Sequence, residues 1–199
     1  MSLFRLPTLV IASANPGKIK EFERMLADSF EVIPLSQTGF TDEIEETGKT
    51  FFENALIKAK TVFERVGQPV LADDSGLCVD ALNGAPGVFS ARYAGERASA
   101  AENNALLLRN LTGQINRSAR FSACVVLYFD NDRFVVGKGE TAGRILTEPD
   151  GTRGFGYDPI FFSDELQQSF GNADGDEKNA VSHRGRALAD LWRNLKKLP

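Results

Sequence analysis

Two neighbouring carboxylates, Asp73 and Asp74, are the strongest sign of chemistry in this chain. They follow the apolar run 70–72, which predicts a strand ending at the acids, and precede a Ser75-Gly76 pair that predicts a turn. Adjacent acids repel each other unless a cation lies beside them, and a divalent metal carrying phosphate oxygens is the usual cation. The alternative is an ordinary turn in which one aspartate caps the backbone.

The second polar cluster consists of Ser13, Ala14, Asn15, Pro16, Gly17 and Lys18. It follows an apolar run and precedes an amphipathic pattern, so we expect a strand, a short loop and a helix. Asn15 is a good N-cap, and Pro16 is favoured at the first helical position. A helix beginning here points its positive end at the loop, where Lys18 adds a full charge, so phosphate is the natural ligand. The alternative is a capped helix with a solvated lysine.

A third cluster lies at the start of a predicted helix over 51–66. Thr50 and Glu53 have the spacing of a capping box, which gives Glu53 a purely structural explanation. Asn54 and Lys58 lie one turn apart on one face of this helix, where both can reach a ligand at its amino end.

An acidic pair, Glu45 and Glu46, stands in the polar loop just before that helix. Solvated acids are common in such loops. The more specific hypothesis is that one of these carboxylates binds a metal ion, and the sequence does not distinguish between the two interpretations.

The fourth cluster combines glycine with aromatic residues in the run Gly154-Phe155-Gly156-Tyr157-Asp158, and a strand-like run follows at 160–162. Glycine leaves the backbone accessible beside flat rings, an arrangement that suits a planar base stacked on a ring and read by main-chain groups. An aromatic turn packed against the core is the alternative.

The fifth cluster opens the last predicted helix and is rich in cations. Ser182 is a plausible cap, and His183 is the only histidine of the chain. A lone histidine is commonly a packing residue, but Lys178, Arg184 and Arg186 flank this one. Together they predict a site for an anion or a keto oxygen.

Alternating helical and extended patterns must position these clusters. We expect helices at about 17–28, 51–66, 100–111 and 184–195, and strands at about 8–12, 31–34, 70–74, 77–79, 120–129 and 133–139. The last two strands predict a hairpin through Asp130-Asn131-Asp132, and residues 83–95 predict a long irregular connection. The order of elements predicts a mixed α/β domain spanning residues 1–199.

Composition is that of an ordinary globular protein, with 199 residues, 42% hydrophobic and 25% charged. The net charge of −4 argues against a surface that binds nucleic acid non-specifically. Cys78 and Cys124 lie in apolar, strand-like runs, so we expect reduced thiols rather than a disulfide. We find neither a signal peptide nor an apolar run long enough to span a bilayer, so we expect a cytoplasmic protein with no membrane partner.

Together the clusters resemble the inosine/xanthosine triphosphate pyrophosphatases, which remove deaminated purine nucleotides. The resemblance runs from Ser13 to Arg186 and is carried, in order, by SANPGK, EETGKTFFENALIKA, LADDSGLCVDALNGAPGVFSARYAG, FGYDPIF and KNAVSHRGRAL. Two departures are mild: Ser-Ala-Asn stands where many members have Thr-Gly-Asn, and Pro16 replaces a small residue. Neither departure removes Asn15 or Lys18.

This resemblance implies an elongated α/β fold, a mixed sheet with flanking helices and two lobes around a central nucleotide-binding cleft. It implies hydrolysis of ITP, dITP and XTP to the monophosphate and pyrophosphate, which keeps these nucleotides out of DNA and RNA. A homodimer is implied as well, and residues 82–93 are our choice for part of its contact. The partners would be a small nucleoside triphosphate and a second copy of the chain.

The resemblance also implies a set of site residues. Asp74 would accept the proton, and Mg²⁺ would be held by Asp74 with Glu45 or Glu46. The substrate-binding residues would be Ser13, Ala14, Asn15, Pro16, Gly17, Lys18, Lys58, Ser75, Phe155, Gly156, Tyr157, Asp158, Lys178, His183 and Arg184. Phe155 is our candidate for stacking on the base, and the donors near it would recognise the 6-keto oxygen.

Two other functions remain open from the residues. A related pyrophosphatase for other modified or pyrimidine nucleotides would share the fold and the magnesium chemistry. A nucleotide sensor without catalysis is the alternative from another class, although a sensor could dispense with Asp74.

Overall fold

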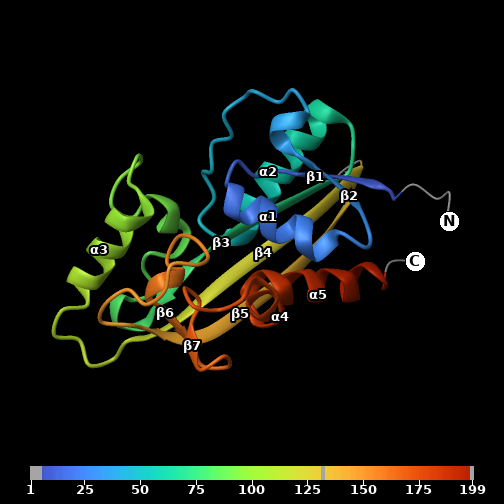
Figure 1. Ribbon diagram of the computed structural model, residues 1–199. Coiled ribbons are helices and arrows are strands. Elements are labelled where there is room, and N and C mark those ends of the chain that lie inside the picture. The colour runs from blue at the N-terminus through green and yellow to red at the C-terminus, as the bar shows by residue number, and fades with distance from the viewer. Residues whose placement is uncertain (1–5, 131–132, 198–199) are drawn as a thin grey trace. The chain divides into compact units, whose positions relative to one another are not determined.

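The computed structural model describes residues 6–130 and 133–197, and Figure 1 shows its ribbon. Its α-helices are α1 (Pro16–Leu26), α2 (Phe51–Val66), α3 (Ala100–Asn110), α4 (Gly175–Val181) and α5 (His183–Leu195). Its strands are β1 (Thr8–Ile11), β2 (Glu31–Pro34), β3 (Val70–Val79), β4 (Ser118–Asp130), β5 (Arg133–Ile145), β6 (Phe161–Ser163) and β7 (Gln168–Ser169). Short 3₁₀ helices are η1 (Leu35–Gln37), η2 (Asp80–Leu82), η3 (Gly87–Arg92) and η4 (Asp158–Ile160).

The strands form one mixed sheet in the order β2-β1-β3-β4-β5-β6-β7. β1 runs parallel to β2 and to β3, with Val10 opposite Ile33 and Val70. β6 runs antiparallel to β5 and to β7. The predicted mixed α/β class with flanking helices is therefore confirmed.

The chain divides into two compact units, each of which we describe by itself. Unit 1 comprises the described residues within 1–74, 124–137 and 189–199, and unit 2 those within 75–123 and 138–188. The boundary between Asp74 and Ser75 falls inside β3, so these two residues are consecutive in one strand.

The core of unit 1 forms where α2 packs against β1, β3 and β4. α2 contributes Ala55, Ala59 and Val62, whose spacing places them on one stripe of the helix. Val70 and Ala72 of β3 face this stripe, and because side chains alternate along a strand, Asp74 lies on the same face. Asp73 therefore points to the other face of the strand.

The core of unit 2 is built around aromatic rings. Phe121 of β4 packs on Phe161 of β6 at 4.6 Å between ring centroids and stacks on Phe170 at 6.0 Å. Leu107 of α3 and Leu77 of β3 complete this fully buried layer. Tyr157 of the aromatic turn belongs to this core, and Val181, which lies beside the cationic residues, packs against it.

The predicted turn at Ser75-Gly76 is wrong, because β3 continues through it to Val79. Gly76 serves a close approach instead: a Cβ here would overlap the carbonyl oxygen of Gly87 and the hydroxyl of Ser90. That hydroxyl accepts a hydrogen bond from the Leu77 N–H at 2.9 Å. A glycine that admits a neighbouring segment resembles a turn glycine when only the sequence is considered.

Most other predicted elements agree with the structure. The helix over 51–66 and the strand over 31–34 have the predicted bounds, and β6 overlaps the strand-like run 160–162, whereas α4 and β7 were not predicted. β4 and β5 both extend beyond the predicted hairpin, whose residues Asn131 and Asp132 lie outside the described residues. Cys78 and Cys124 are buried thiols that are not joined in a disulfide, as expected.

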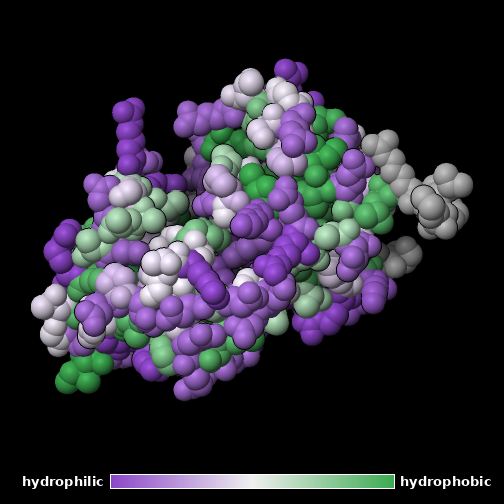
Figure 2. Space-filling view, in the orientation of Figure 1, coloured by the Kyte–Doolittle hydropathy of each residue, from purple (hydrophilic) through white to green (hydrophobic). Residues whose placement is uncertain are grey.

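Hydrophilic side chains cover much of the face in Figure 2, with hydrophobic residues gathered mainly among the segments of unit 1. Of the large hydrophobic residues within 6–130 and 133–197, four are exposed: Leu6, Phe89, Ile115 and Phe134. In the same part of the chain, no helix combines the length and the apolar character that crossing a membrane requires.

Candidate active site

The amino end of α1 is closed by its own cap. Asn15 Oδ1 accepts hydrogen bonds from the N–H groups of Gly17 (2.9 Å) and Lys18 (3.3 Å), and Pro16 takes the first helical position, as predicted. The Asn15 N–H in turn donates to Ser13 Oγ at 3.1 Å. Because the cap already uses two first-turn N–H groups, an anion here would depend mainly on the side chains. The neighbouring Ala14 is exposed.

Lys18 reaches from α1 to Asp73, with 2.7 Å between Nζ and Oδ2. The Asp73 side chain is fully buried, and that of Lys18 is 15% exposed. A buried carboxylate is costly unless it is paired, so this contact stabilises Asp73 and limits the positions open to the ammonium group. Asp73 therefore acts here as the partner of a lysine.

Asp74 is held by two side chains of α2. Lys58 Nζ lies 3.0 Å from Asp74 Oδ1, and the Asn54 Nδ2–H donates to Oδ2 at 3.2 Å. Burial raises the pKa of the Asp74 carboxyl, while Lys58 and Lys18 oppose that shift and Glu46 adds to it. A carboxylate with a raised pKa is a stronger base than an ordinary aspartate, which suits it to accept a proton from water.

The two loop glutamates differ in their surroundings. Glu46 Oε1 lies 3.3 Å from Lys58 Nζ, the same ammonium group that contacts Asp74. Glu45 is exposed, and its carbonyl oxygen accepts the Thr47 N–H at 3.1 Å. Within 6–130 and 133–197, no three His, Cys, Asp or Glu side chains form a group that could hold a metal ion.

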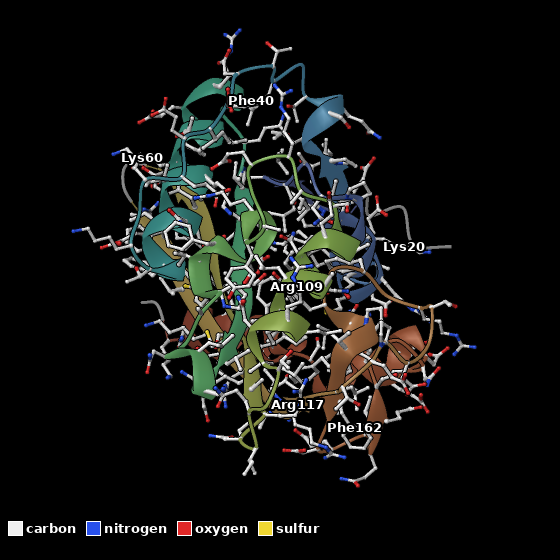
Figure 3. The ribbon with its side chains drawn as sticks, turned by 90° about the vertical axis from the view of Figure 1, so that its left-hand side faces the viewer. Lys20, Phe40, Lys60, Arg109, Arg117 and Phe162 are labelled. Atoms are coloured by element: carbon white, nitrogen blue, oxygen red, sulfur yellow. The ribbon has the colours of Figure 1, made fainter. Side chains whose placement is uncertain are left out.

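Position along α2 decides which lysine is buried. Lys58 is 8% exposed, whereas Lys60 projects at the outer edge of the structure in Figure 3. Residues two apart on a helix point in different directions, so only Lys58 shares a face with Asn54. The capping box of Thr50 and Glu53, which the sequence predicts, fixes the start of this helix.

In unit 2 the cationic cluster gathers on Phe155. Lys178 Nζ lies 4.8 Å from the centre of this half-buried ring, and the Arg184 guanidinium carbon lies 5.2 Å from it. Arg184 is buried and also donates to Ser75 Oγ at 2.9 Å. The ring is thus surrounded by cations, which suits a base with keto oxygens at its edge.

The turn at 154–158 is supported from beneath by its own side chains. Asp158 is buried, and its Oδ2 accepts the Phe155 N–H at 2.7 Å and lies 2.5 Å from Lys178 Nζ. The Tyr157 hydroxyl donates to the Ser90 carbonyl oxygen at 2.9 Å, and burial raises the pKa of this phenol. Both side chains therefore fix the shape of the turn that carries the Phe155 ring.

One contact of this turn was not visible in the sequence. The Asn104 Nδ2–H of α3 donates to the Gly156 carbonyl oxygen at 3.1 Å. His183 is 2% exposed and stacks on Phe121 with 4.7 Å between ring centroids, a packing contact that the sequence left as one alternative. Ser182 caps the following helix through the Gly185 N–H at 3.1 Å, as predicted.

The comparisons with known proteins cover nearly the whole chain. A sequence profile of the Ham1 family matches residues 9–194. The chain belongs to the Ham1 family. The predicted resemblance is therefore confirmed over all five sequence clusters.

Curated relatives in this family have the name "dITP/XTP pyrophosphatase". The protein of this name from Treponema denticola is 46% identical over 94% of this chain and 98% of its own length. The one from Bacillus subtilis is 44% identical over 94% of this chain and 96% of its own length. The match is thus full-length on both sides.

Solved structures of Ham1 proteins share the fold. The Ham1 protein of Coxiella burnetii is 42% identical, with a TM-score of 0.85 over 97% of this chain and all of its own. The Ham1 protein of Staphylococcus aureus is 39% identical, with a TM-score of 0.83 over 95% of this chain and 98% of its own.

Each unit therefore brings some of the expected residues into contact. In unit 1, contacts link Lys18 with Asp73, and Lys58 with Asp74 and Glu46. In unit 2 they link Ser75, Phe155, Asp158, Lys178 and Arg184. Among the remaining expected residues, those of the α1 cap belong to local structure, and Glu45 contacts neither of these sets.

Proposed function

We propose that this protein hydrolyses deaminated purine nucleoside triphosphates, namely ITP, dITP and XTP, to the monophosphate and pyrophosphate. The names of the curated relatives support this activity, since they match the chain over almost its whole length. Removing these nucleotides from the pool would prevent their incorporation into DNA and RNA.

The observation that carries the proposal is the buried pairing of Asp74 with Lys58 on α2. In the reaction, the oxygen of a water molecule bonds to the α phosphorus and the bond to the oxygen bridging the α and β phosphates breaks. Asp74 accepts the proton of the water, and pyrophosphate leaves. Lys18 and Lys58 balance the negative charge of the phosphates, which grows on the leaving group.

The carboxylates of unit 1 fit a Mg²⁺ ion. This ion is usually held by one or two carboxylates together with substrate phosphates, and Asp74 and Glu46 supply two that share one lysine. We favour Glu46 over Glu45 because only Glu46 makes that contact. When bound, the ion would draw charge from phosphate oxygens and lower the pKa of a water molecule.

Recognition of the base falls to the cations and the turn of unit 2. Hypoxanthine and xanthine carry a keto oxygen at position 6, where adenine carries an amino donor. Lys178 and Arg184 have only donors to offer, so they suit the keto oxygen and provide no acceptor for the amino group of adenine. Phe155, with both cations beside its ring, supplies the stacking surface.

A homodimer in the cytoplasm is the setting that we propose for this activity. Phe89, which is 57% exposed, lies within the segment 82–93 chosen for the dimer contact. An exposed aromatic residue is typical of a surface that a second copy covers. Light scattering of the purified protein measures its mass in solution, and a monomeric mass would contradict the dimer.

Pyrophosphate release tests the function directly. The wild-type protein is incubated with ITP, dITP, XTP, ATP, dUTP or dTTP, with Mg²⁺ or with EDTA. We expect turnover of the first three nucleotides only, and only with Mg²⁺. Binding of dITP without turnover would support a sensor, and preference for dUTP or dTTP would support a pyrimidine enzyme.

A matched pair of variants links the activity to the site. Asp74→Asn removes the proton acceptor, whereas Asp80→Asn makes the same change at a residue whose contact is with Arg120. We expect the first to abolish turnover and the second to leave it intact.

A further inference from the structure

Asn54 is a buried polar residue that contacts Asp74, with 1% of its surface exposed. Both ends of its amide are used: Nδ2–H donates to Asp74 Oδ2 at 3.2 Å, and Oδ1 accepts the Gly48 N–H at 2.8 Å. An amide can donate and accept at once, and it does so without a change of charge. Asn54 thereby ties the carboxylate of β3 to the loop that carries Glu46.

Lys58 makes a second tie of the same kind one helical turn later. Its ammonium group contacts Asp74 Oδ1 at 3.0 Å and Glu46 Oε1 at 3.3 Å. Between them, Asn54 and Lys58 contact both oxygens of Asp74, which restricts the plane of the carboxylate. They also hold the loop at two points, Glu46 and Gly48, so its position is set by the same helix face.

The hydrogen bond between Gly48 and Asn54 requires the loop backbone to lie very close to the start of α2. A Cβ atom at this position would lie 2.6 Å from Asn54 Oδ1 and 2.6 Å from Glu53 Cβ. Real Cβ atoms do not approach other atoms so closely, so a side chain at residue 48 would displace the loop or Asn54. The adjacent Lys49 N–H donates to Glu53 Oε2 at 2.6 Å, which anchors the next residue of the loop.

We propose that Asn54 is a positioning residue for the hydrolysis, which orients Asp74 and holds the Glu46 loop beside it. This inference rests on the function proposed above. The amide acts on the reaction through Asp74 and the loop. Its loss would let the carboxylate rotate and the loop move away, so that the proton acceptor and Glu46 no longer face the same phosphate.

Asn54→Ala tests the proposal, with Asn103→Ala as its matched control. Asn103 is also a buried helical asparagine whose amide is used at both ends, on Ala94 N–H (2.7 Å) and the Ala91 carbonyl oxygen (3.1 Å). Both of these partners belong to unit 2, whereas Asp74 and the loop belong to unit 1. We expect both variants to melt at lower temperature by similar amounts, because each loses two buried hydrogen bonds.

Kinetics then separate positioning from stability. We expect Asn54→Ala to lower kcat for dITP about 10- to 100-fold, as second-layer partners commonly do, with KM changed less than about threefold. Asn103→Ala keeps kcat within about twofold of wild type. A wild-type kcat in Asn54→Ala, or an equal loss of kcat in both variants, would overturn the proposal.

Two further variants each disrupt one of the two hydrogen bonds that the Asn54 amide makes, to Asp74 and to Gly48. Asn54→Asp keeps the acceptor for the Gly48 N–H but replaces the donor to Asp74 with a like charge. Gly48→Ala obstructs the loop contact and keeps the donor. We expect kcat to fall in both, and a wild-type kcat in either variant would contradict the positioning role.

Hydrogen exchange at the Gly48 amide gives a reading that needs no substrate. We expect faster exchange in Asn54→Ala and unchanged exchange in Asn103→Ala. If the wild type does not hydrolyse ITP, dITP and XTP, the proposed function is wrong. If it hydrolyses them, but kcat and the exchange rate of the Gly48 amide are the same in Asn54→Ala as in the wild type, only the positioning role is wrong. Should Asn54→Ala not fold, Gly48→Ala decides by the same kcat measurement.

Discussion

Replacing Lys58 with methionine should show how strongly unit 1 depends on one buried cation. The side chains of Lys58 and Asp74 are 10% and 8% exposed, and their polar atoms lie 3.0 Å apart. Methionine has a similar length but no charge, so the variant leaves Asp74 with the Asn54 hydrogen bond and without its nearest cation.

The magnitude follows from the burial of the pair. Removing one partner of a buried ion pair costs about 3–5 kcal/mol, and we take about 3 kcal/mol because Asn54 and the charge of Lys18 remain. For a chain of this size, each kcal/mol lowers Tm by about 2–4 °C, so we expect a fall of about 6–12 °C at pH 7. With Asp74→Asn present, the same change should cost only about 1 kcal/mol.

Urea unfolding of the four proteins in this cycle, without metal or nucleotide, measures the coupling. Lys60→Met is the control for a lysine on the outer side of α2 and should cost about 0.5 kcal/mol or less. An equal cost of Lys58→Met with and without the Asp74 carboxylate would refute the reasoning, because the loss would then not come from an unpaired charge.

The pH dependence of Lys58→Met has a definite sign. Burial already raises the pKa of Asp74 above its ordinary value of 3.8, and removing Lys58 raises it further. A group with a raised folded-state pKa favours folding most while it is protonated, below its ordinary pKa. That contribution is lost as pH rises through the folded-state pKa. The free energy of unfolding of the variant should therefore approach that of the wild type near pH 4 and fall below it as the pH rises.

Three further outcomes are expected. Asp74→Asn should lower the free energy of unfolding at pH 7 by less than Lys58→Met does, because Lys58 keeps Glu46 as a partner; urea titrations of the two variants compare the losses. Lys18→Ala should cost about 2–4 kcal/mol of transition-state stabilisation, or about 30- to 1,000-fold in kcat/KM, with the exposed Lys20→Ala as control; a loss below tenfold would contradict the role. Tyr157→Phe should lower the free energy of unfolding by about 1 kcal/mol, because the Ser90 carbonyl oxygen loses its buried donor.

Local signals in the sequence were enough to predict α2. The capping box of Thr50 and Glu53 marks its start, and Gly67 in the left-handed conformation closes its end. A similar signal precedes α4, where Asp174 and Glu177 form another capping box at the start of a seven-residue helix that the sequence analysis did not predict. Short helices carry too few apolar positions for periodicity to reveal them.

Tertiary contacts explain what the sequence could not predict. Gly76 reads as a turn residue until Ser90 is placed against it, and these residues meet only when η3 folds back on β3. The ion pair of Asp158 and Lys178 likewise joins residues 20 positions apart. Residue type predicted that these positions carry charge, but only the fold determines which charges meet.

Asp73 and Asp74 are chemically identical neighbours, yet the pleat of β3 sorts them, one toward the lysine of α1 and the other toward the lysine of α2. Whether a residue occupies an odd or an even position along β3 therefore decides which of the two lysines it faces. Inserting a single residue ahead of the pair would turn each acid to the opposite face of the strand. Inserting two would restore the faces but move both acids about 7 Å along the strand, away from both lysines.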